Sequence, residues 1–420
     1  MSEWKEIKID QLCEAIVDCV NKTAPIVDEI TPYRMIRTTN VKDGRIDLSS
    51  TNYVTEDVFR KWTRRSTLQE GDIILTREAP LGEVGKIIDG ENLFLGQRLM
   101  MYRPASDIVD PDFLFYAFLS KEVQYQIKSF GMGSTVEHMR VGDCSEIIVK
   151  VPSLQEQREI GKTLSILDRK ISNLRQQNET LERIAQTLFK HWFVDFEFLN
   201  EDGKPYKSSG GEMVRSELGE IPVGWHVGKL GDEVETLGGG TPSTKEPEYW
   251  VNGDIPWYSP TDLTKSNTLL SLGSEKQITS LGLEKSSAKL FPKYSLLLTS
   301  RATIGEITIN TKDACTNQGF ITLIPNETFS VYFLHGWLIT QIKLIKQLAS
   351  GSTFPELSKS VFRNFPFLIP SAMQLIQYDQ LIKPAFQKVE NNIGQIQTLT
   401  KTRDVLLPKL MSGKLRITAS

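Results

Sequence analysis

The most regular pattern of hydrophobic and polar positions lies between Leu154 and Phe193, in a segment without proline. Its apolar positions alternate between steps of four and three residues, which is the heptad seam of a coiled coil. At ~1.5 Å per residue, such a helix would be about 60 Å long. A seam of this length requires a partner, although periodicity alone also allows one long helix lying across a globular domain. The seam positions are Ile160, Leu164, Leu167, Ile171, Leu174, Asn178, Leu181, Ala185, Leu188 and Trp192.

The second half of the chain repeats the first at an offset of 218 residues. The repeat predicts a duplicated unit, each copy being a globular domain followed by a long helix, and it makes the two helices each other's partner. The matches include Gly133-Ser134-Thr135 with Gly351-Ser352-Thr353, Phe115 with Phe333, Lys128 with Lys346 and Pro152 with Pro370. The second seam runs through Tyr378, Ile382, Ala385, Val389, Asn392, Ile396, Leu399, Arg403, Leu406 and Leu410.

Each seam contains one asparagine, Asn178 in the first and Asn392 in the second. A buried amide requires a hydrogen-bond partner, so we expect the two to face each other across antiparallel helices. This register places Arg403 opposite Leu167, and we expect the arginine head to reach water. The other expected pairs are Leu174 with Ile396, Ile171 with Leu399, Leu164 with Leu406, Ile160 with Leu410, Leu181 with Val389 and Leu188 with Ile382.

The ends and interior of the two helices carry local signals. Ser153 followed by Glu156 predicts a capping box at the start of the first helix. Gly413 is a plausible cap at the end of the second. Pro384 lies inside the second helix and is expected to kink it, because proline removes a backbone donor.

Short runs of β-type residues between turn signals fill both globular blocks, and residues 112–129 have helical periodicity. The first block has such runs at 33–36, 72–76, 83–88 and 147–151. The predicted fold class is α+β, with two mixed α/β domains joined by two long antiparallel helices related by a pseudo-two-fold repeat. The predicted boundaries are 1–152 for the first domain, 153–198 for the first helix, 199–224 for a glycine- and serine-rich linker or exposed loop, 225–370 for the second domain and 371–416 for the second helix.

Composition places the chain among ordinary globular proteins, with 420 residues and a net charge of −3. The four cysteines form no CxxC pair, so the sequence suggests neither a disulfide framework nor a zinc site. The first residues do not resemble a signal peptide, and no run of 18 apolar residues occurs. We therefore expect a reduced, cytoplasmic protein without a membrane segment.

The sequence contains none of the motifs GxxxxGK[ST], HExxH or GxSxG, nor the loop of an amino-methyltransferase. The four histidines lack metal spacing. Basic and polar side chains of the kinds that contact phosphates and base edges recur instead at matching loops of both blocks. The candidate DNA-binding residues are Arg34, Arg37, Thr38, Asn40, Lys42, Arg64, Arg65, Arg77, Gln97, Arg98, Ser134 and Thr135 in the first block, and Tyr258, Ser259, Thr261, Lys265, Ser300, Arg301, Gln318, Ser352 and Thr353 in the second.

The whole chain resembles the DNA-specificity subunit of type I restriction-modification systems. The resemblance rests on the duplicated order of variable domain, Gly-Ser-Thr, a hydrophobic run ending in proline, and a long helix. It also rests on three segments: Leu154–Ile160 (LQEQREI), Ser216–Pro222 before Gly224-Trp225, and Leu407–Gly413 (LPKLMSG). The second half departs from the pattern, because Glu156-Gln157 of the first helix corresponds to Gln374-Leu375.

The resemblance implies two target-recognition domains that each read half of a bipartite, asymmetric site on double-stranded DNA. It implies assembly with two methyltransferase (M) subunits, which bind S-adenosylmethionine and methylate adenine, and with restriction (R) subunits that use ATP and Mg²⁺. No cofactor or metal is expected on this chain itself. Two other classes stay open: a coiled-coil scaffold without DNA specificity, and a single-chain DNA-modifying enzyme with an unrecognised site.

Overall fold

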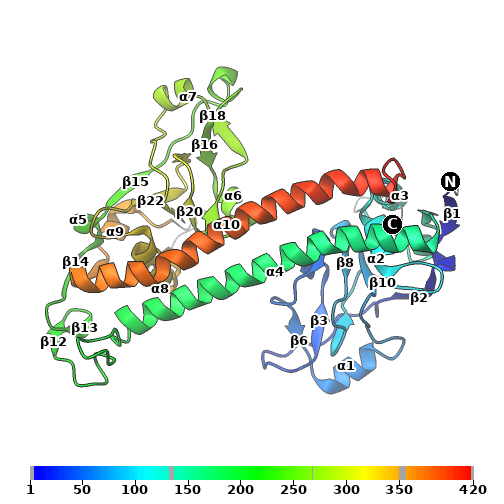
Figure 1. Cartoon of the computed structure of the whole chain (residues 1–420), viewed down its shortest axis with the longest axis horizontal. Helices are drawn as coiled ribbons and strands as arrows, with labels where there is room; N and C mark the ends of the chain where they lie inside the picture. Colours follow the sequence, from blue (N-terminus) through cyan, green and yellow to red (C-terminus); the bar gives the residue numbers. More distant parts are fainter. Residues whose placement is uncertain (1–3, 132–136, 267, 350–355, 418–420) are drawn as a thin grey trace. The chain divides into compact units, whose positions relative to one another are not determined.

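The structure is a computed structural model that describes residues 4–131, 137–266, 268–349 and 356–417. The chain forms two compact units, one made of residues 1–171 and 398–420 and the other of residues 172–397. Two helices of 40 residues, α4 (Leu154–Phe193) and α10 (Ala372–Met411), each pass through both units (Figure 1). The candidates Ser134, Thr135, Ser352 and Thr353 lie outside the described residues.

The first unit is built on an antiparallel sheet of four strands in the order β2-β10-β7-β8. A smaller sheet, β6-β3-β9, lies beside it, and β1 pairs with β11. The strands of the unit are β1 (Lys5–Lys8), β2 (Cys13–Asp18), β3 (Arg34–Ile36), β4 (Val41–Lys42), β5 (Arg45–Ile46), β6 (Asn52–Tyr53), β7 (Ile73–Arg77), β8 (Leu81–Lys86), β9 (Leu93–Leu95), β10 (Leu99–Pro104) and β11 (Ile148–Val151). The strand predictions for this block are therefore right in position, to within a few residues.

Three helices complete this domain: α1 (Glu56–Trp62), α2 (Pro111–Leu119) and α3 (Lys121–Gly131). The single helical stretch expected over residues 112–129 is thus two helices. Ser120 has extended backbone angles and ends α2, and its hydroxyl accepts a hydrogen bond from the Val123 N–H at the start of α3. A serine that offers the backbone this alternative partner favours a helix end over a helix interior.

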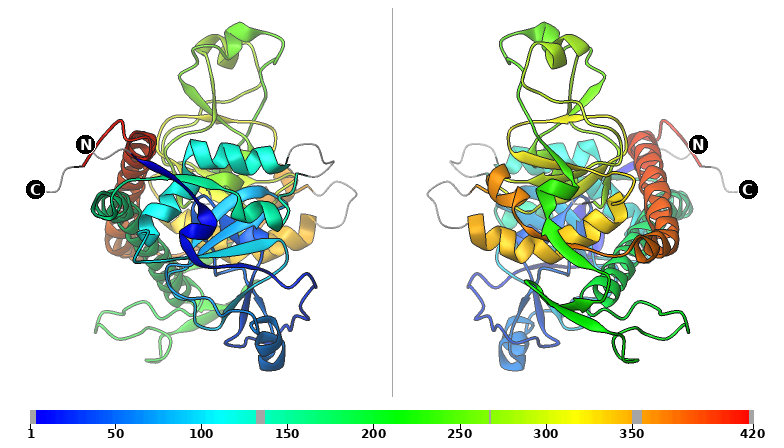
Figure 2. Two further views of the ribbon diagram at one scale, coloured as in Figure 1. Left: turned by 90° about the vertical axis from the view of Figure 1, so that its right-hand side faces the viewer. Right: turned by 90° about the vertical axis from the view of Figure 1, so that its left-hand side faces the viewer.

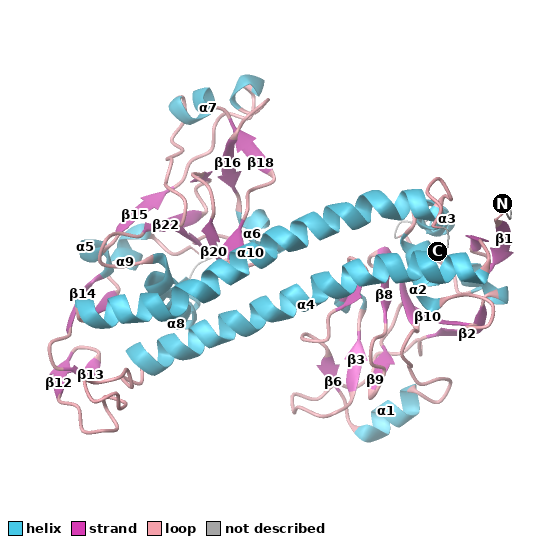
Figure 3. Cartoon of the chain, in the orientation of Figure 1, coloured by secondary structure: helices cyan, strands magenta, loops and turns pink. Residues whose placement is uncertain are grey.

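The second unit has the same architecture with different loops (Figure 3). Its main sheet has the order β15-β22-β19-β20-β17, its smaller sheet β18-β16-β21, and β14 pairs with β23. The strands are β12 (Met213–Ser216), β13 (Gly219–Pro222), β14 (His226–Lys229), β15 (Glu235–Gly238), β16 (Ile255–Tyr258), β17 (Leu270–Ser271), β18 (Lys276–Ile278), β19 (Leu296–Thr299), β20 (Ile307–Asn310), β21 (Cys315–Thr316), β22 (Phe320–Ile324) and β23 (Pro366–Ile369).

The helices of the second unit, besides its parts of α4 and α10, are α5 (Leu230–Glu233), α6 (Pro260–Ser266), α7 (Ser280–Glu284), α8 (Val331–Ala349) and α9 (Lys359–Arg363). Strands β16 and β18 and helix α7 extend away from α10, as views from two directions agree (Figure 1, Figure 2). The second domain therefore presents a projecting tip on the side opposite its long helix.

The two domains share strand register as well as strand order, which establishes the internal repeat. Lys5 pairs with Val151 in the first unit, and His226 pairs with Ile369 in the second. His226 follows Lys5 by 221 residues, and Ile369 follows Val151 by 218. In the main sheets, Leu99 pairs with Thr76 and Phe320 with Thr299. The duplication read from the sequence is therefore a duplication of the fold.

The segment 199–224 carries more structure than its composition predicts. Strands β12 and β13 form a hairpin, and the rings of Phe198 and Tyr206 stack with centroids 4.7 Å apart. Phe198 also stacks on Trp225 at 5.1 Å. Aromatic burial therefore anchors a loop that glycine and serine content alone would describe as an open linker.

In the second unit, α4 and α10 pack antiparallel in the predicted register. The Asn392 side-chain amide donates to the Asn178 carbonyl oxygen at 2.8 Å, and both residues are buried. Farther along the pair, the rings of Phe193 and Tyr378 lie 5.0 Å apart. The expected seam residues Leu181, Leu188, Ile382 and Val389 belong to the same hydrophobic cluster.

In the first unit, Ile160, Leu164 and Leu410 are buried in one cluster with the helix α2, again with the two helices antiparallel. The Arg403 head, expected to reach water, is only partly exposed because it is also paired within the protein. Its guanidinium binds the Asp168 carboxylate at 2.8 Å, and the Tyr116 hydroxyl donates to the same carboxylate at 2.6 Å. Asp168, the residue after Leu167, therefore provides an ion-pair partner that lies next to the hydrophobic seam rather than on it.

The local signals at the helix ends have mixed outcomes. The Glu156 N–H donates to the Ser153 hydroxyl, which is one half of the capping box, but the Glu156 carboxylate binds Arg416 at 2.7 Å instead of closing the box. Gly413 caps α10 with φ 67°. Helix α10 continues through Pro384 without interruption.

Candidate nucleic-acid interface

Three candidate residues are buried and bonded within the protein. The Asn40 side chain accepts from the Arg37 N–H at 2.8 Å and donates to the Ser50 hydroxyl at 2.9 Å, which caps a short 3₁₀ helix. The Tyr258 hydroxyl donates to Ser271 at 3.1 Å, and Ser300 is 3% exposed. In this conformation the Asn40 and Tyr258 side chains form hydrogen bonds within the protein, and none of the three residues contributes to an exposed surface that could contact DNA.

Four basic candidates lie on the surface in ion pairs: Arg65 with Asp18 at 2.5 Å, Arg98 with Glu78 at 3.5 Å, Lys265 with Glu275 at 2.6 Å and Arg301 with Glu356 at 2.7 Å. All four basic side chains are more than half exposed, at 63%, 52%, 62% and 52%. Exposed pairs of this kind contribute about 0–1 kcal/mol each. Their basic members can therefore exchange a carboxylate for a phosphate at little cost.

The remaining described candidates form a third group of exposed or half-buried side chains. Arg37, Arg64 and Arg77 donate to the backbone carbonyls of Ser50, Lys61 and Met139. Ser259 donates to the Asp262 carboxylate at 2.6 Å, which caps helix α6. The other members of the group are half-buried or exposed: Arg34, Thr38, Lys42, Gln97, Thr261 and Gln318.

One loop arrangement occurs in both units. It comprises the turn between β7 and β8 in the first domain and the turn between β19 and β20 in the second. The Thr76 hydroxyl accepts from the Glu83 N–H, and the Thr299 hydroxyl accepts from the Glu306 N–H, both at 2.9 Å. Each turn has glycine at high positive φ, Gly82 at 93° and Gly305 at 94°. The same hydrogen bond and a glycine of the same conformation thus recur at this turn in both copies.

A second segment joins this turn in each unit. The Arg77 N–H donates to the Arg98 carbonyl at 2.8 Å, and the Ser300 N–H donates to the Gly319 carbonyl at 2.7 Å. Immediately before Arg98 and Gly319 stand the candidates Gln97 and Gln318, half-buried and exposed respectively. The structure therefore brings residues 77–83 and 97–98 together in the first unit, and residues 300–306 and 318–319 in the second.

A threonine contacts each of these glutamines, and neither threonine is among the candidates predicted from the sequence. The Thr23 hydroxyl donates to Gln97 Oε1 at 3.2 Å, and the Thr241 hydroxyl donates to Gln318 Oε1 at 2.7 Å. Thr23 and Thr241 are separated by 218 residues, the offset of the repeat. A search for polar residues that recur at this offset would have found them.

The buried thiols do not form a nucleophilic centre. Burial raises the pKa of Cys13 and Cys315 to about 12 and that of Cys144 to about 11, so these thiols stay protonated near neutral pH. All four cysteines are free. Within the described ranges, no group of three His, Cys, Asp or Glu side chains could hold a metal ion.

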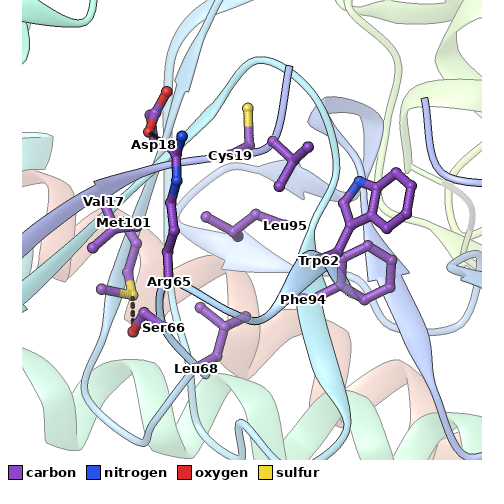
Figure 4. Close-up of a pocket in the computed structure, with 11 residues that line it drawn as sticks. Val17, Asp18, Cys19, Trp62, Arg65, Ser66, Leu68, Phe94, Leu95 and Met101 are labelled. Carbon is purple, nitrogen blue, oxygen red and sulfur yellow. Dashed lines mark hydrogen bonds and ion pairs between the residues drawn. The ribbon is translucent and has the colours of Figure 1, made fainter. Parts of the chain in front are cut away.

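The hollows of the first unit do not form an obvious ligand site. One cavity, of about 30 Å³, lies between the Asp18–Arg65 ion pair and the rings of Trp62 and Phe94 (Figure 4). A space of that size holds water rather than a base or cofactor. A wider, open hollow of about 320 Å³ is lined by acidic and basic side chains together, among them Glu83, Lys128 and Arg403.

A family model described as "Type I restriction modification DNA specificity domain" matches residues 1–183 and 222–402. The chain belongs to this type I DNA-specificity family. The family match covers each copy of the repeat, so it agrees with the duplicated α+β fold.

Relatives in the type I specificity family cover most of the chain. The specificity subunit of type I restriction enzyme MjaIX from Methanocaldococcus jannaschii is 32% identical over 370 residues, covering 87% of this chain and 82% of the relative. The HindI specificity subunit from Haemophilus influenzae is 25% identical over 407 residues, covering 84% and 88%. Because these relatives are named specificity subunits, the prediction of a non-catalytic specificity subunit is confirmed at the level of the family.

A solved structure shows the same fold. The crystal structure of a type I restriction-modification system S subunit from M. genitalium superimposes with a TM-score of 0.58 at 19% identity, covering 99% of this chain and 97% of that one. In the part of the chain described by the structure, no helix is long and apolar enough to cross a membrane.

Proposed function

We propose that this chain reads a bipartite, asymmetric site on double-stranded DNA, one half-site with each unit. We further propose that it positions two methyltransferase subunits and the restriction subunits of a cytoplasmic type I system. S-adenosylmethionine, ATP and Mg²⁺ would then be bound by those partners rather than by this chain.

The observation that carries the proposal is a fixed frame with divergent loop side chains. Strand register in the main sheets recurs in both units, and so does the hydrogen bond from a glutamate N–H to a threonine hydroxyl at the β7–β8 and β19–β20 turns. The residues at matching positions on that frame differ: Arg98 corresponds to Gly319, and Glu78 to Arg301. Equal frames with unequal surfaces are what two half-sites of different sequence require, because base edges are read by side chains.

The two long helices are suited to hold partner subunits. Besides the seam, they expose large apolar side chains: Ile166 and Val405 in the first unit are 51% and 55% exposed, and Ile184, Ile376 and Leu381 in the second are 52%, 58% and 58% exposed. Isolated exposed apolar residues are common. In the second unit, Ile376 and Leu381 are exposed on the same helix, and we propose that side chains of this kind on the long helices contact a partner subunit.

The test uses the chain co-expressed with its methyltransferase partner in a host that lacks DNA methylation, with methylated adenines mapped across the genome. Residues 1–150 are replaced by the matching domain of a relative. We expect one half-site of the methylated motif to change and the other to persist. A change in both halves would contradict independent recognition by the two units.

Duplex binding by the purified complex across a salt series separates the alternatives. A specific reader loses affinity steeply as salt rises, because phosphate contacts release counterions, and it retains a sequence preference. Binding without any sequence preference would favour a scaffold. Methylation by this chain without its partner would favour a single-chain enzyme.

A further inference from the structure

The paired threonine and glutamine, Thr23–Gln97 and Thr241–Gln318, recur at equivalent places in both units. Each glutamine immediately precedes the turn into a central strand, β10 or β22. Each threonine lies in the loop that follows the neighbouring strand of the sheet, which is β2 beside β10 and β15 beside β22. The loops between strand and threonine differ in length, with five residues from Asp18 to Thr23 and three from Gly238 to Thr241. The threonine–glutamine hydrogen bond thus recurs in both units although the loops that carry the threonines differ in length.

The side chains around the pair are not kept. Arg98 follows Gln97, whereas Gly319 follows Gln318. In the adjoining turn, Glu78 of the first unit corresponds to Arg301 of the second. Glu78 forms an ion pair with Arg98, whereas Arg301 forms one with Glu356. The glutamine amide held by a threonine hydroxyl is therefore a side-chain feature common to both loop arrangements, whereas the charged side chains beside it differ.

The hydrogen bond leaves a defined pattern of unused groups on the glutamine. Because Oε1 accepts from the threonine, it retains a second lone pair, while Nε2 keeps its donors. Within the described residues, neither Nε2 donates to an acceptor of the protein. A free acceptor beside a free donor, in the plane of one amide, matches the major-groove edge of adenine, whose N6 donates and whose N7 accepts.

We propose that Gln97 and Gln318 each contact the adenine of one A·T base pair through its N6 and N7, one pair in each half-site. Thr23 and Thr241 are positioning residues that hold the amide in the orientation for this contact. The inference rests on the proposed function, because it assigns particular readers to the two half-sites. Holding the amide before binding lowers the conformational entropy lost when DNA is bound.

The first experiment maps methylated motifs for single variants co-expressed with the methyltransferase partner. Gln97→Ala should relax one A·T position in one half-site, lowering discrimination there about 5- to 100-fold, the range of one bidentate contact. Gln318→Ala should do the same in the other half-site. Each variant therefore serves as the control for the other, and its untouched half-site reports that the complex is folded and active.

Two further variants test the chemistry. Gln97→Glu replaces the amide donor by an acceptor, so we expect the affected position to shift from adenine toward cytosine, whose N4 donates. Thr23→Val removes the hydroxyl at similar size and should weaken the same position, by less than Gln97→Ala. Relaxation at a different position in Thr23→Val would contradict the positioning role.

Duplexes containing 7-deazaadenine, which lacks N7, test the contact at the level of one atom. Replacing the adenine at the position relaxed by Gln97→Ala should lower the affinity of the wild-type complex about 5-fold or more and have no further effect on the variant. A uniform loss of methylation at all sites, or an unchanged motif in both alanine variants, would overturn the inference. The proposed function fails separately, if the wild-type complex shows no sequence preference.

Discussion

His335, on helix α8, is a fully buried histidine beside the ring of Phe386, with centroids 5.7 Å apart. Burial lowers its pKa from 6.5 to about 4. The unfolded chain therefore takes up this proton before the folded chain as the pH falls. The histidine is compatible with the fold above about pH 6.5 and destabilises it progressively between about pH 6.5 and 4.

We expect this group to lower the free energy of unfolding by about 2 kcal/mol between pH 7.5 and 5.0. In His335→Gln, which cannot take up a proton, that part of the pH dependence should disappear. The measurement is urea unfolding of both proteins at the two pH values. The comparison is needed because burial raises the pKa of Asp379 in the same unit, which contributes with the opposite sign. Equal slopes for variant and wild type would contradict the assignment.

For single residues, the sequence indicates which side chains are polar but not which of them are exposed to solvent after folding. Tyr258 and Gln318 are both polar residues beside predicted turns, yet one is 1% exposed and the other lies on the surface. The difference arises because Tyr258 packs into a hydrophobic cluster with Leu263 and Phe291, a contact that is made only after folding, whereas Gln318 lies in an exposed turn. Neither the hydrophobic periodicity nor a local sequence motif indicates such contacts. The candidates chosen by residue type therefore include both the buried Tyr258 and the exposed Gln318.

Between elements, Asn178 and Asn392 are the clearest device that sets register. Asn392 is fully buried, and its carbonyl oxygen has no hydrogen-bond partner among the described residues. Leucine at this position would leave the Asn178 amide buried without its partner. We expect Asn392→Leu to lower the free energy of unfolding by about 1–3 kcal/mol.

The double variant Asn178→Leu/Asn392→Leu should recover most of that loss and be less specific in register, because two leucines pack without a hydrogen bond to satisfy. Urea unfolding checks both variants. Asn391→Leu is the matched control, since its side chain is exposed on the same helix. Additive effects of the two single leucine substitutions would show that the two amides are not coupled.

A second device occupies the other part of the helix pair. Arg403, Asp168 and Tyr116 form a partly buried polar cluster in the first unit. The residues at the same places in the repeat are Ala185, Phe386 and Leu334, which belong to an apolar cluster in the second unit. The internal repeat therefore places a polar cluster in the first unit where the second unit has apolar side chains.

Asp168→Ala should therefore destabilise the first unit by about 1–3 kcal/mol, because it leaves the Arg403 guanidinium partly buried without that partner. Phe386→Ala, the matching change in the second unit, removes apolar packing instead. Added salt distinguishes the two: the loss in Asp168→Ala relative to wild type should shrink at high salt, whereas the loss in Phe386→Ala should not. Similar salt responses would contradict an electrostatic role for Asp168.

The elements themselves were predictable where the pattern extended over many residues. Heptad spacing over about ten turns identified both long helices, and the single asparagine in each seam identified their register. Ser120 and the 213–222 hairpin were not predicted, since one hydrogen bond decides the first and aromatic stacking at Phe198 anchors the second. Short-range chemistry of this kind can override periodicity.

For the whole molecule, the duplication is the most informative feature of the sequence, because it relates residues that lie far apart along the chain. It predicts two domains of one topology and makes the helices partners. The offset of the repeat is 218 in the helices and drifts to 221 and 223 in the domains. That drift marks the loops where the two domains differ, and those loops are where the two half-sites would be distinguished.

Each unit contains part of both helices, and the division falls between Ile171 and Ser172 in α4 and between Gln397 and Thr398 in α10. Inserting seven residues at both points keeps the heptad phase and leaves the Asn178–Asn392 pair and the Asp168–Arg403 pair within their own units. The insertion adds about 10 Å of helix, which corresponds to about three base pairs at ~3.4 Å each. If the helices set the spacing between half-sites, the methylated motif should keep both halves and gain about three base pairs between them. Inserting five residues at the same points is the control, because it turns the seam by about 140° and should abolish activity. An active seven-residue variant with an unchanged gap would show that the spacing is set elsewhere.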